Sequence, residues 1–234
     1  MSVLGQRTDT DTASLMRPDT PRQLRLDAIE QSACKRGGVH TRPNQTVAKI
    51  TGALTKVGTV TTGTSPDFIE VNAAETYAYV VNSGSYDVYQ YSINSTTDLL
   101  TYLTTVATGG TSPLFIAINP AGTYAYVANS GSGTISVFSI NSTTGAHTAI
   151  TGSPFTAASA YSVTRNPAGT VAYLPTFGSN TVSVYTIDST TGGISSAVAG
   201  SPSASGTSTQ DIAFNSSGTF AYSVSSAVLF EQQF

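Results

Sequence analysis

The chain has 234 residues, of which 39% are hydrophobic and 9% aromatic, and its formal net charge is −3. This apolar content is enough for one globular core and argues against a collagen-like, transmembrane or fully disordered chain. Only 10% of the residues are charged, whereas an ordinary soluble domain carries about 25%. Ser, Thr and Gly take their place, so we expect a polar but weakly charged surface.

The first part of the chain differs in composition from the rest. Residues 1–49 hold eight of the ten Lys and Arg and five of the thirteen acids, a net charge of +3, whereas every Tyr and Phe lies at or after Phe68. We interpret residues 1–47 as a poorly ordered basic leader, because they have too few large apolar side chains to offset the entropy cost of ordering. Acids interleave the basic residues and stacking aromatics are missing, so nucleic-acid binding is not expected.

The sequence also limits the compartment and the redox chemistry. A secretory signal peptide and a membrane span are not expected, since no apolar stretch has the length or the position for either. Cys34 is the single cysteine and is expected to be an idle thiol. A low charge and many Ser, Thr and Gly are typical of extracytoplasmic or cell-surface repeat proteins. This composition therefore weakly favours such a location, although the sequence shows no signal peptide.

An internal repeat dominates the remainder of the chain. The motif Thr-Tyr-Ala-Tyr-Val at residues 76–80 recurs with small changes, and its second tyrosine gives the period: Tyr79, Tyr126, Tyr173 and Tyr222. The differences between these numbers are 47, 47 and 49. Self-similarity at such a period is typical of repeat architectures in which each unit is one small supersecondary structure.

Each copy predicts four short strands, from its β-branched and aromatic residues and its turn residues. In the second copy they span residues 114–119, 124–129, 134–140 and about 146–150. Asn-Pro-Ala-Gly at residues 119–122 suits a type I turn because Pro presets φ. Apolar residues on both faces of the first strand need cover on both sides, which blades stacked around an axis provide.

We therefore expect an all-β fold, a β-propeller of four-stranded antiparallel blades, over residues 48–234; a β-solenoid is the alternative. The expected parts are an outer strand at 50–60, blades at about 66–107, 113–156 and 160–203, and two strands of a partial blade at 210–225.

The repeat resembles the YVTN repeat of the lactonase propeller family, through Tyr-Val-Ala-Asn at 126–129, Ser132 and Thr-Ile-Ser-Val-Phe-Ser-Ile at 134–140. The resemblance implies a relation to seven-bladed 6-phosphogluconolactonase-like proteins and to surface-layer and periplasmic repeat proteins. Seven such repeats need about 330 residues. We therefore expect either a truncated propeller, which we favour, or a ring completed by a second copy, with self-association through open blade edges.

Two residues of the repeats are candidates for chemistry on a lactone, which requires a base to activate water and a cation or donor for the oxyanion. His147 occupies an apolar position of the repeat on the outermost strand, where a tolerated edge residue is the expectation. Arg165 interrupts the apolar innermost strand and is a candidate to hold an anionic ligand, or else a paired side chain. A catalytic residue is therefore not assigned.

A variable polar and aromatic rim is the expected binding surface, because loops at one end of a propeller share a face; ordinary turn residues are the alternative. With Arg165, the candidate binding residues are Asp67, Asn82, Tyr86, Asp87, Asn129, Tyr161, Arg165 and Asn180. Metal sites and cofactors are not expected, since the sequence lacks a serine-hydrolase elbow, a phosphate loop and a Cys or His cluster. The predicted function is a non-catalytic binding or surface-scaffold module, and the alternative is a lactone hydrolase of the 6-phosphogluconolactonase-like kind.

Overall fold

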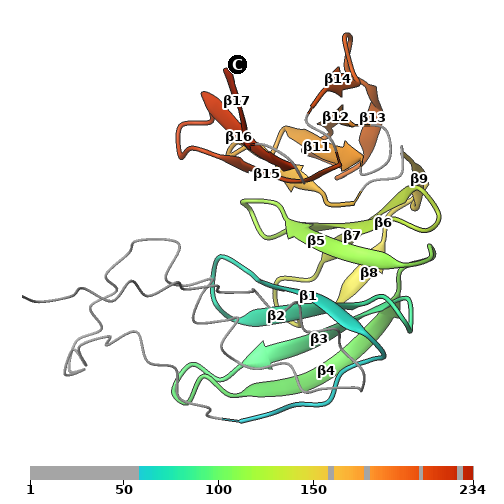
Figure 1. Cartoon of the computed structure of the whole chain (residues 1–234). Coiled ribbons are helices and arrows are strands. Elements are labelled where there is room, and N and C mark those ends of the chain that lie inside the picture. Colours follow the sequence, from blue (N-terminus) through green and yellow to red (C-terminus); the bar gives the residue numbers. More distant parts are fainter. Residues whose placement is uncertain (1–57, 158–160, 177–179, 206–207, 226–228, 234) are drawn as a thin grey trace, which may run out of the picture.

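The computed structural model describes residues 58–157, 161–176, 180–205, 208–225 and 229–233. Every element in these residues is a β-strand, and the strands form four antiparallel sheets that follow one another in chain order (Figure 1). The expectation of an all-β propeller of antiparallel blades is confirmed. The basic leader, Cys34 and residues 50–57 of the expected outer strand lie outside the described residues, and residues 58–60 are not in a strand.

We name the sheets blades 1 to 4. Blade 1 contains β1 (Pro66–Val71), β2 (Tyr77–Asn82), β3 (Asp87–Ile93) and β4 (Leu100–Ala107). Blade 2 contains β5 (Pro113–Ile118), β6 (Tyr124–Asn129), β7 (Thr134–Ile140), β8 (His147–Ala149) and β9 (Phe155–Thr156). Blade 3 contains β10 (Thr164–Arg165), β11 (Val171–Thr176), β12 (Thr181–Ile187), β13 (Ile194–Ala197) and β14 (Ser203–Ala204). Blade 4 contains β15 (Thr209–Phe214), β16 (Phe220–Ser225) and β17 (Leu229–Gln233).

The turn between the first two strands of a blade follows the sequence pattern. In blade 2 the Gly122 amide donates to the Asn119 carbonyl at 2.9 Å, and Gly122 has a φ of 70°. The Asn119 side-chain oxygen accepts hydrogen bonds from the amides of Thr123 and Tyr124. Because Asn satisfies backbone donors and Gly adopts the left-handed conformation without strain, this short turn sets the register of β5 against β6.

Three features differ from the expected strands. In blades 2 and 3 the fourth strand is replaced by two short pieces, β8 with β9 and β13 with β14, that pair with the third strand one after the other. The first strand of blade 3 shrinks to two residues beside Pro175 of β11, because proline has no amide hydrogen to donate to the ladder. Blade 4 has a third strand, β17, where the sequence predicts only two strands.

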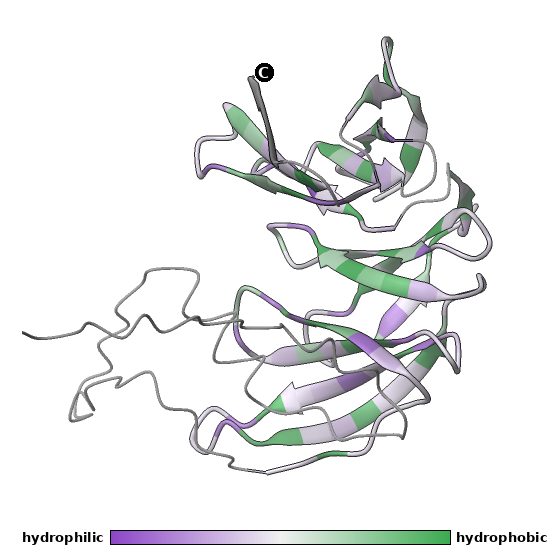
Figure 2. Ribbon diagram, viewed as in Figure 1, coloured by the Kyte–Doolittle hydropathy of each residue, from purple (hydrophilic) through white to green (hydrophobic). Residues whose placement is uncertain are grey.

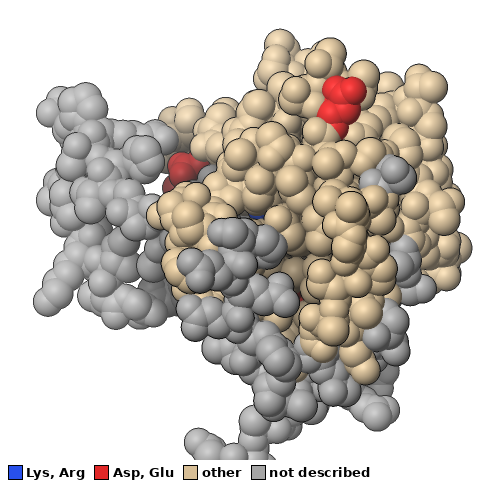
Figure 3. All heavy atoms as spheres, turned by 90° about the horizontal axis from the view of Figure 1, so that it is seen from above, with Lys and Arg blue, Asp and Glu red and all other residues tan. Residues whose placement is uncertain are grey.

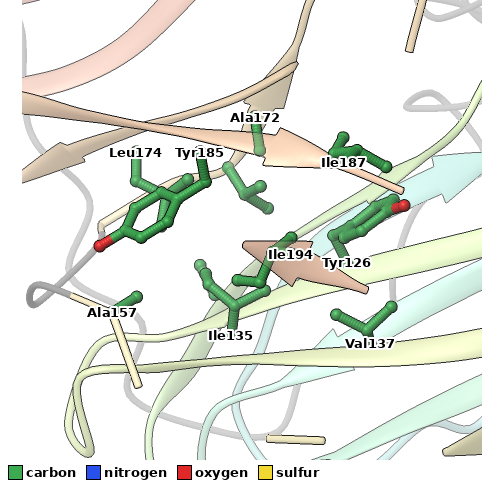
Figure 4. Packing of buried hydrophobic residues seen from close by; sticks show 11 residues of the cluster. Tyr126, Ile135, Val137, Ala157, Ala172, Leu174, Tyr185, Ile187 and Ile194 are labelled. Atoms are coloured by element: carbon green, nitrogen blue, oxygen red, sulfur yellow. The ribbon is translucent and has the colours of Figure 1, made fainter. Parts of the chain in front are cut away.

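The apolar core lies between blades rather than inside each one. Tyr79 and Val81 of β2 pack with Ile116 and Val127 of blade 2, and a second cluster joins blades 2 and 3 (Figure 4). Figure 2 shows hydrophobic residues running along β5, the strand whose two faces both need cover. The first strands of neighbouring blades lie side by side, β1 beside β5 and β10 beside β15, as the innermost strands of a propeller do.

Candidate functional site

The candidate rim residues of blade 1 form a hydrogen-bonded hairpin end. Asn82 is buried at the end of β2, and its Nδ2 donates to Oδ1 of Asp87 at 2.8 Å. Ser85 Oγ donates to the same carboxylate oxygen at 2.9 Å, and Thr62 Oγ1 donates to Asn82 Oδ1 at 2.8 Å. Asn82 therefore ties the segment before β1 to the β2–β3 hairpin, which is a structural task.

Asn129 occupies the same repeat position in blade 2 and is also fully buried. Its Nδ2 donates to Ser136 Oγ at 2.7 Å and to Thr134 Oγ1 at 3.1 Å. Its Oδ1 is a buried acceptor without a hydrogen-bond partner among the described residues. Gly110 lies so close that an added Cβ would be 2.5 Å from the Asn129 side chain. The amide is thus packed beneath the rim and does not project from it.

Tyr86, Gly133 and Asn180 occupy the same turn position in blades 1, 2 and 3. Their φ angles are positive, 58°, 62° and 57°, and they lie in the β2–β3, β6–β7 and β11–β12 hairpins, respectively. Tyr86 is 43% exposed, and Asn180 accepts a hydrogen bond from the Ser208 amide at 2.7 Å. The turn requires a positive φ at this position, and Asn tolerates that conformation better than Tyr does.

The innermost strands begin with a repeated irregularity at the variable position. The ladder of β1 with β2 shifts between Pro66 and Phe68, that of β5 with β6 between Pro113 and Phe115, and that of β15 with β16 between Thr209 and Asp211. The residue skipped in blade 1 is Asp67, which is exposed. Bulges re-aim a side chain at the rim of a sheet. The equivalent residue of blade 3, Tyr161, is also exposed, and its amide donates to the Pro175 carbonyl.

Arg165 lies on β10 and is partly buried between blades 2 and 3. Its Nε donates a hydrogen bond to the Ile118 carbonyl of β5. Burial raises the pKa of Tyr126, the positive charge of Arg165 opposes that rise, and so the guanidinium lies near this phenol. Arg165 therefore links the inner strands of blades 2 and 3.

A polar cluster that the sequence analysis missed joins blades 3 and 4. Oδ1 of Asp211 on β15 accepts hydrogen bonds from Thr164 Oγ1 at 3.1 Å and from Ser162 Oγ at 3.3 Å. The repeat register could have indicated it, because Asp211 and Ser162 stand where Phe68 and Phe115 stand in blades 1 and 2. Those two rings stack with centroids 3.8 Å apart. One row of inner positions is therefore aromatic in blades 1 and 2 and polar in blades 3 and 4.

His147 is not the edge residue that its place on the outermost strand predicts. It is 7% exposed, its ring stacks on Tyr79 of blade 1 with centroids 4.3 Å apart, and both ring nitrogens lack a hydrogen-bond partner among the described residues. Burial lowers its pKa to about 3. The expectation is wrong because the outer strand of blade 2 is covered by the neighbouring blade, so a residue on it can be as buried as the core.

The eight candidate binding residues thus have different surroundings. Asn82, Tyr86 and Asp87 lie in one hairpin of blade 1, where the Tyr86 amide donates to the Asn82 carbonyl and Asn82 Nδ2 donates to Asp87. The other five belong to separate turns or strands of three blades. Their role in binding stays a prediction. Within the described residues there is no group of three or more His, Cys, Asp or Glu that could hold a metal ion, and no helix suited to crossing a membrane. One face of the molecule carries charge at only a few places (Figure 3).

Solved structures with the same fold come from several bacteria. A protein from Lactobacillus plantarum is 20% identical with a TM-score of 0.66, and the match covers 79% of this chain and 58% of that one. The periplasmic gluconolactonase PpgL of Pseudomonas aeruginosa is 16% identical with a TM-score of 0.58, covering 76% and 58%. For a putative 6-phosphogluconolactonase from Bacteroides fragilis the values are 21%, 0.53, 62% and 40%. These likenesses concern the fold alone.

The length of the matches and the family model complete the comparison. The chain spans between 40% and 58% of the length of these three structures. No curated protein sequence matches it significantly. The model of the family described as "Lactonase, 7-bladed beta-propeller" matches residues 37–226, which is most of the chain. The repeat, the antiparallel blades and this match agree, and the chain belongs to the lactonase family of β-propellers.

Proposed function

We propose that this lactonase-family propeller acts as a non-catalytic binding or surface-scaffold module, with its ligand held over the inner strands. The proposal rests on the hydrogen bonds that the polar groups of the inner strands make. Asp211 accepts hydrogen bonds from Ser162 and Thr164 of the neighbouring blade, and Arg165 donates to the Ile118 carbonyl. Groups that link blades in this way are fixed in position by their hydrogen bonds, which suits them to ligand binding more than to proton transfer.

The histidine adds to this argument. General-base catalysis needs a group that reaches the reacting water and exchanges its proton near the working pH. His147, the one histidine among the described residues, is sealed between blades, and burial keeps its pKa at about 3. It can neither reach a substrate nor titrate near neutral pH, which favours binding over hydrolysis.

The inner row also indicates the kind of ligand. The stacked rings of Phe68 and Phe115 offer an apolar surface, and the partly buried carboxylate of Asp211 offers oxygen acceptors further along the same row. Arg165 is the single Lys or Arg within the residues that the structure describes. Such a surface suits a small, neutral, hydroxylated molecule better than a polyanion, because a carboxylate accepts hydrogen bonds from hydroxyls and repels phosphate.

Lactone hydrolysis is the second candidate function, and family membership favours it. In that case Asp211 would take a proton from water, the hydroxide would add to the lactone carbonyl carbon, and the ring C–O bond would break as the leaving oxygen is protonated. Arg165 would stabilise the oxyanion. Two of the similar structures are described as a gluconolactonase and a putative 6-phosphogluconolactonase, so glucono-δ-lactone is the reasonable probe.

The two functions separate in one experiment. Hydrolysis of glucono-δ-lactone is followed in a pH-stat with the full chain and with its Asp211→Asn and Asp188→Asn variants, while calorimetry measures binding of glucose, a neutral hydroxylated probe. Asp188 is a matched control, since it makes hydrogen bonds to the amides of Thr190 and Thr191 in an exposed turn. We expect no rate above the spontaneous one and saturable binding that weakens at least tenfold in Asp211→Asn only. A protein-dependent rate that Asp211→Asn abolishes and Asp188→Asn preserves would establish the hydrolase instead.

A further inference from the structure

Blade 1 has an open outer edge that differs from those of blades 2 and 3. Its outer strand, β4, runs without interruption for eight residues and is the last strand of its sheet. Residues 101–105 are all exposed, and no described strand pairs with the outer side of β4. In blades 2 and 3 the outer strand is broken into pieces of two to four residues, with Pro154 or Pro202 between them. Short edge strands and prolines protect a sheet from further pairing, and β4 lacks both.

The side chains of β4 also favour pairing with another strand. The strand contains no Lys, Arg, Asp, Glu or Pro. Leu99, which precedes it, is 41% exposed, and Tyr102 and Leu103 are 47% and 40% exposed. Blade 2 has Ala146 and Ala149 where blade 1 has Leu99 and Tyr102. An uncharged edge with large exposed apolar residues is a surface to which a further strand can be added.

The pairing of β4 with β3 decides which backbone groups the open edge offers. The Thr108 amide donates to the Tyr86 carbonyl, and the Asn94 amide donates to the Leu99 carbonyl, so Leu99 and Thr108 point inward. Backbone groups alternate in direction along a strand. The residues whose N–H and C=O groups point outward are therefore Leu100, Tyr102, Thr105 and Ala107. They are two, three and two residues apart, because a bulge at Leu103 adds one residue to β4.

This spacing selects the partner. A regular extended peptide offers its backbone groups at every second residue, so it matches one half of β4 but not both halves. A second β4 in antiparallel orientation has the same extra residue at the same place. Leu100 then pairs with the partner's Ala107, and Tyr102 pairs with the partner's Thr105. All outward groups are satisfied by about eight hydrogen bonds, which is within the usual range for a protein interface.

Charge favours the same antiparallel orientation. Asp98 is exposed and is the charged residue closest in sequence to β4. In the antiparallel pairing it lies opposite the partner's Gly109, so the two Asp98 carboxylates are at opposite ends of the strand pair. A parallel pairing would bring these two carboxylates side by side, and like charges opposite each other destabilise a sheet.

We propose that β4 pairs antiparallel with β4 of a second copy of this chain about a two-fold axis, which joins the two blade 1 sheets into one sheet of eight strands, four from each copy. The same surface is used on both copies, so the assembly closes as a dimer. The contact lies at the outer edge of blade 1 and leaves the inner strands free. It is therefore independent of the ligand proposed above and of the number of blades in the ring.

The test is the mass of the full chain in solution, measured by light scattering after size exclusion. We expect about 48 kDa, which is twice the 24.1 kDa of one chain. The double variant Tyr102→Lys with Thr105→Lys places like charges opposite each other in both central pairs and should give 24.1 kDa. The double variant Tyr102→Lys with Thr105→Glu places opposite charges in the same pairs and should keep the double mass. Both variants change the same two exposed residues, so the difference between them reports the pairing itself.

A matched control adds the same charges elsewhere. Thr148→Lys with Ala149→Lys changes two exposed residues of the short outer strand β8 in blade 2 and should keep the double mass. An unchanged far-UV spectrum checks that each variant is folded. A folded wild-type monomer, a Lys-Lys variant of β4 that stays dimeric, a Lys-Glu variant that is monomeric, or assemblies larger than a dimer would each overturn the proposal.

Discussion

Blades 2 and 4 are built from the same repeat but differ in what covers them. Tyr126 of blade 2 lies beneath blade 3 in the cluster shown in Figure 4, whereas Tyr222 of blade 4 keeps more than a third of its surface in water. The local sequences around them, Thr-Tyr-Ala-Tyr-Val and Thr-Phe-Ala-Tyr-Ser, are closely similar. In a repeat protein the stability of a unit therefore depends on its neighbour as much as on its own residues.

The largest expected effect tests this comparison directly. Tyr126→Ala should lower the free energy of unfolding by about 3–5 kcal/mol, the usual cost of removing a buried aromatic ring. Tyr222→Ala should change it by less than about 1 kcal/mol, as exposed substitutions do. Both are measured by urea unfolding at a protein concentration where the chain is monomeric. Equal effects would mean that blade 4 is covered in the monomer and would remove the difference between the blades.

The sealed interface between blades 1 and 2 predicts a pH dependence that blade 4 lacks. The pKa of His147 is about 3 in the folded protein and 6.5 is its ordinary value, so the unfolded chain binds the extra proton as pH falls. Stability is therefore unaffected above about pH 6.5 and is lost as pH drops toward 3. His147→Leu removes this loss and should raise stability at pH 5 by about 2 kcal/mol more than at pH 7.

Urea unfolding of wild type and His147→Leu at the two pH values measures this difference. The substitution places leucine where blade 1 has Leu100, at the same position of the repeat. If both proteins show the same pH dependence, the histidine is protonated or exposed in the folded state, and the interface is not sealed.

The smallest expected effect concerns the fastening of blade 4. Asp211→Asn replaces a charged acceptor by a neutral one for the hydroxyls of Ser162 and Thr164. Charge-assisted hydrogen bonds are stronger than neutral ones, so we expect a loss of about 1 kcal/mol. Hydrogen exchange should show this loss as faster opening of β15 and β16 with β6 and β7 unchanged. Uniform acceleration across all blades would indicate one cooperative unit instead of separately fastened blades.

The sequence predicted much of the fold because its signals are local. The period of 47 residues, the Asn-Pro-Ala-Gly turn and the second and third strands of blade 2 all agree with the structure. The short β10 could have been predicted from Pro175, which occupies a strand position where the other blades have a residue with an amide hydrogen. The third strand of blade 4 could not be, because the residues of β17 do not follow the repeat.

The candidate site was predicted less well, because the surroundings of its residues depend on contacts that are not local in the sequence. Polar residues at a turn, such as Asn82, look alike in sequence whether they project into solvent or bond beneath the rim. His147 stood out only as an exception to the repeat and Asp211 was missed, and the surroundings of both residues include side chains of another blade.

By itself the sequence determined the architecture, because strand periodicity, turn residues and repeat length act within about 47 residues of chain. The tertiary structure alone decided which tyrosines are buried, that His147 is sealed from water, and that Asp211 meets Ser162 and Thr164. These outcomes depend on packing between side chains that lie a whole repeat apart, and burial is a property of both contacting surfaces together.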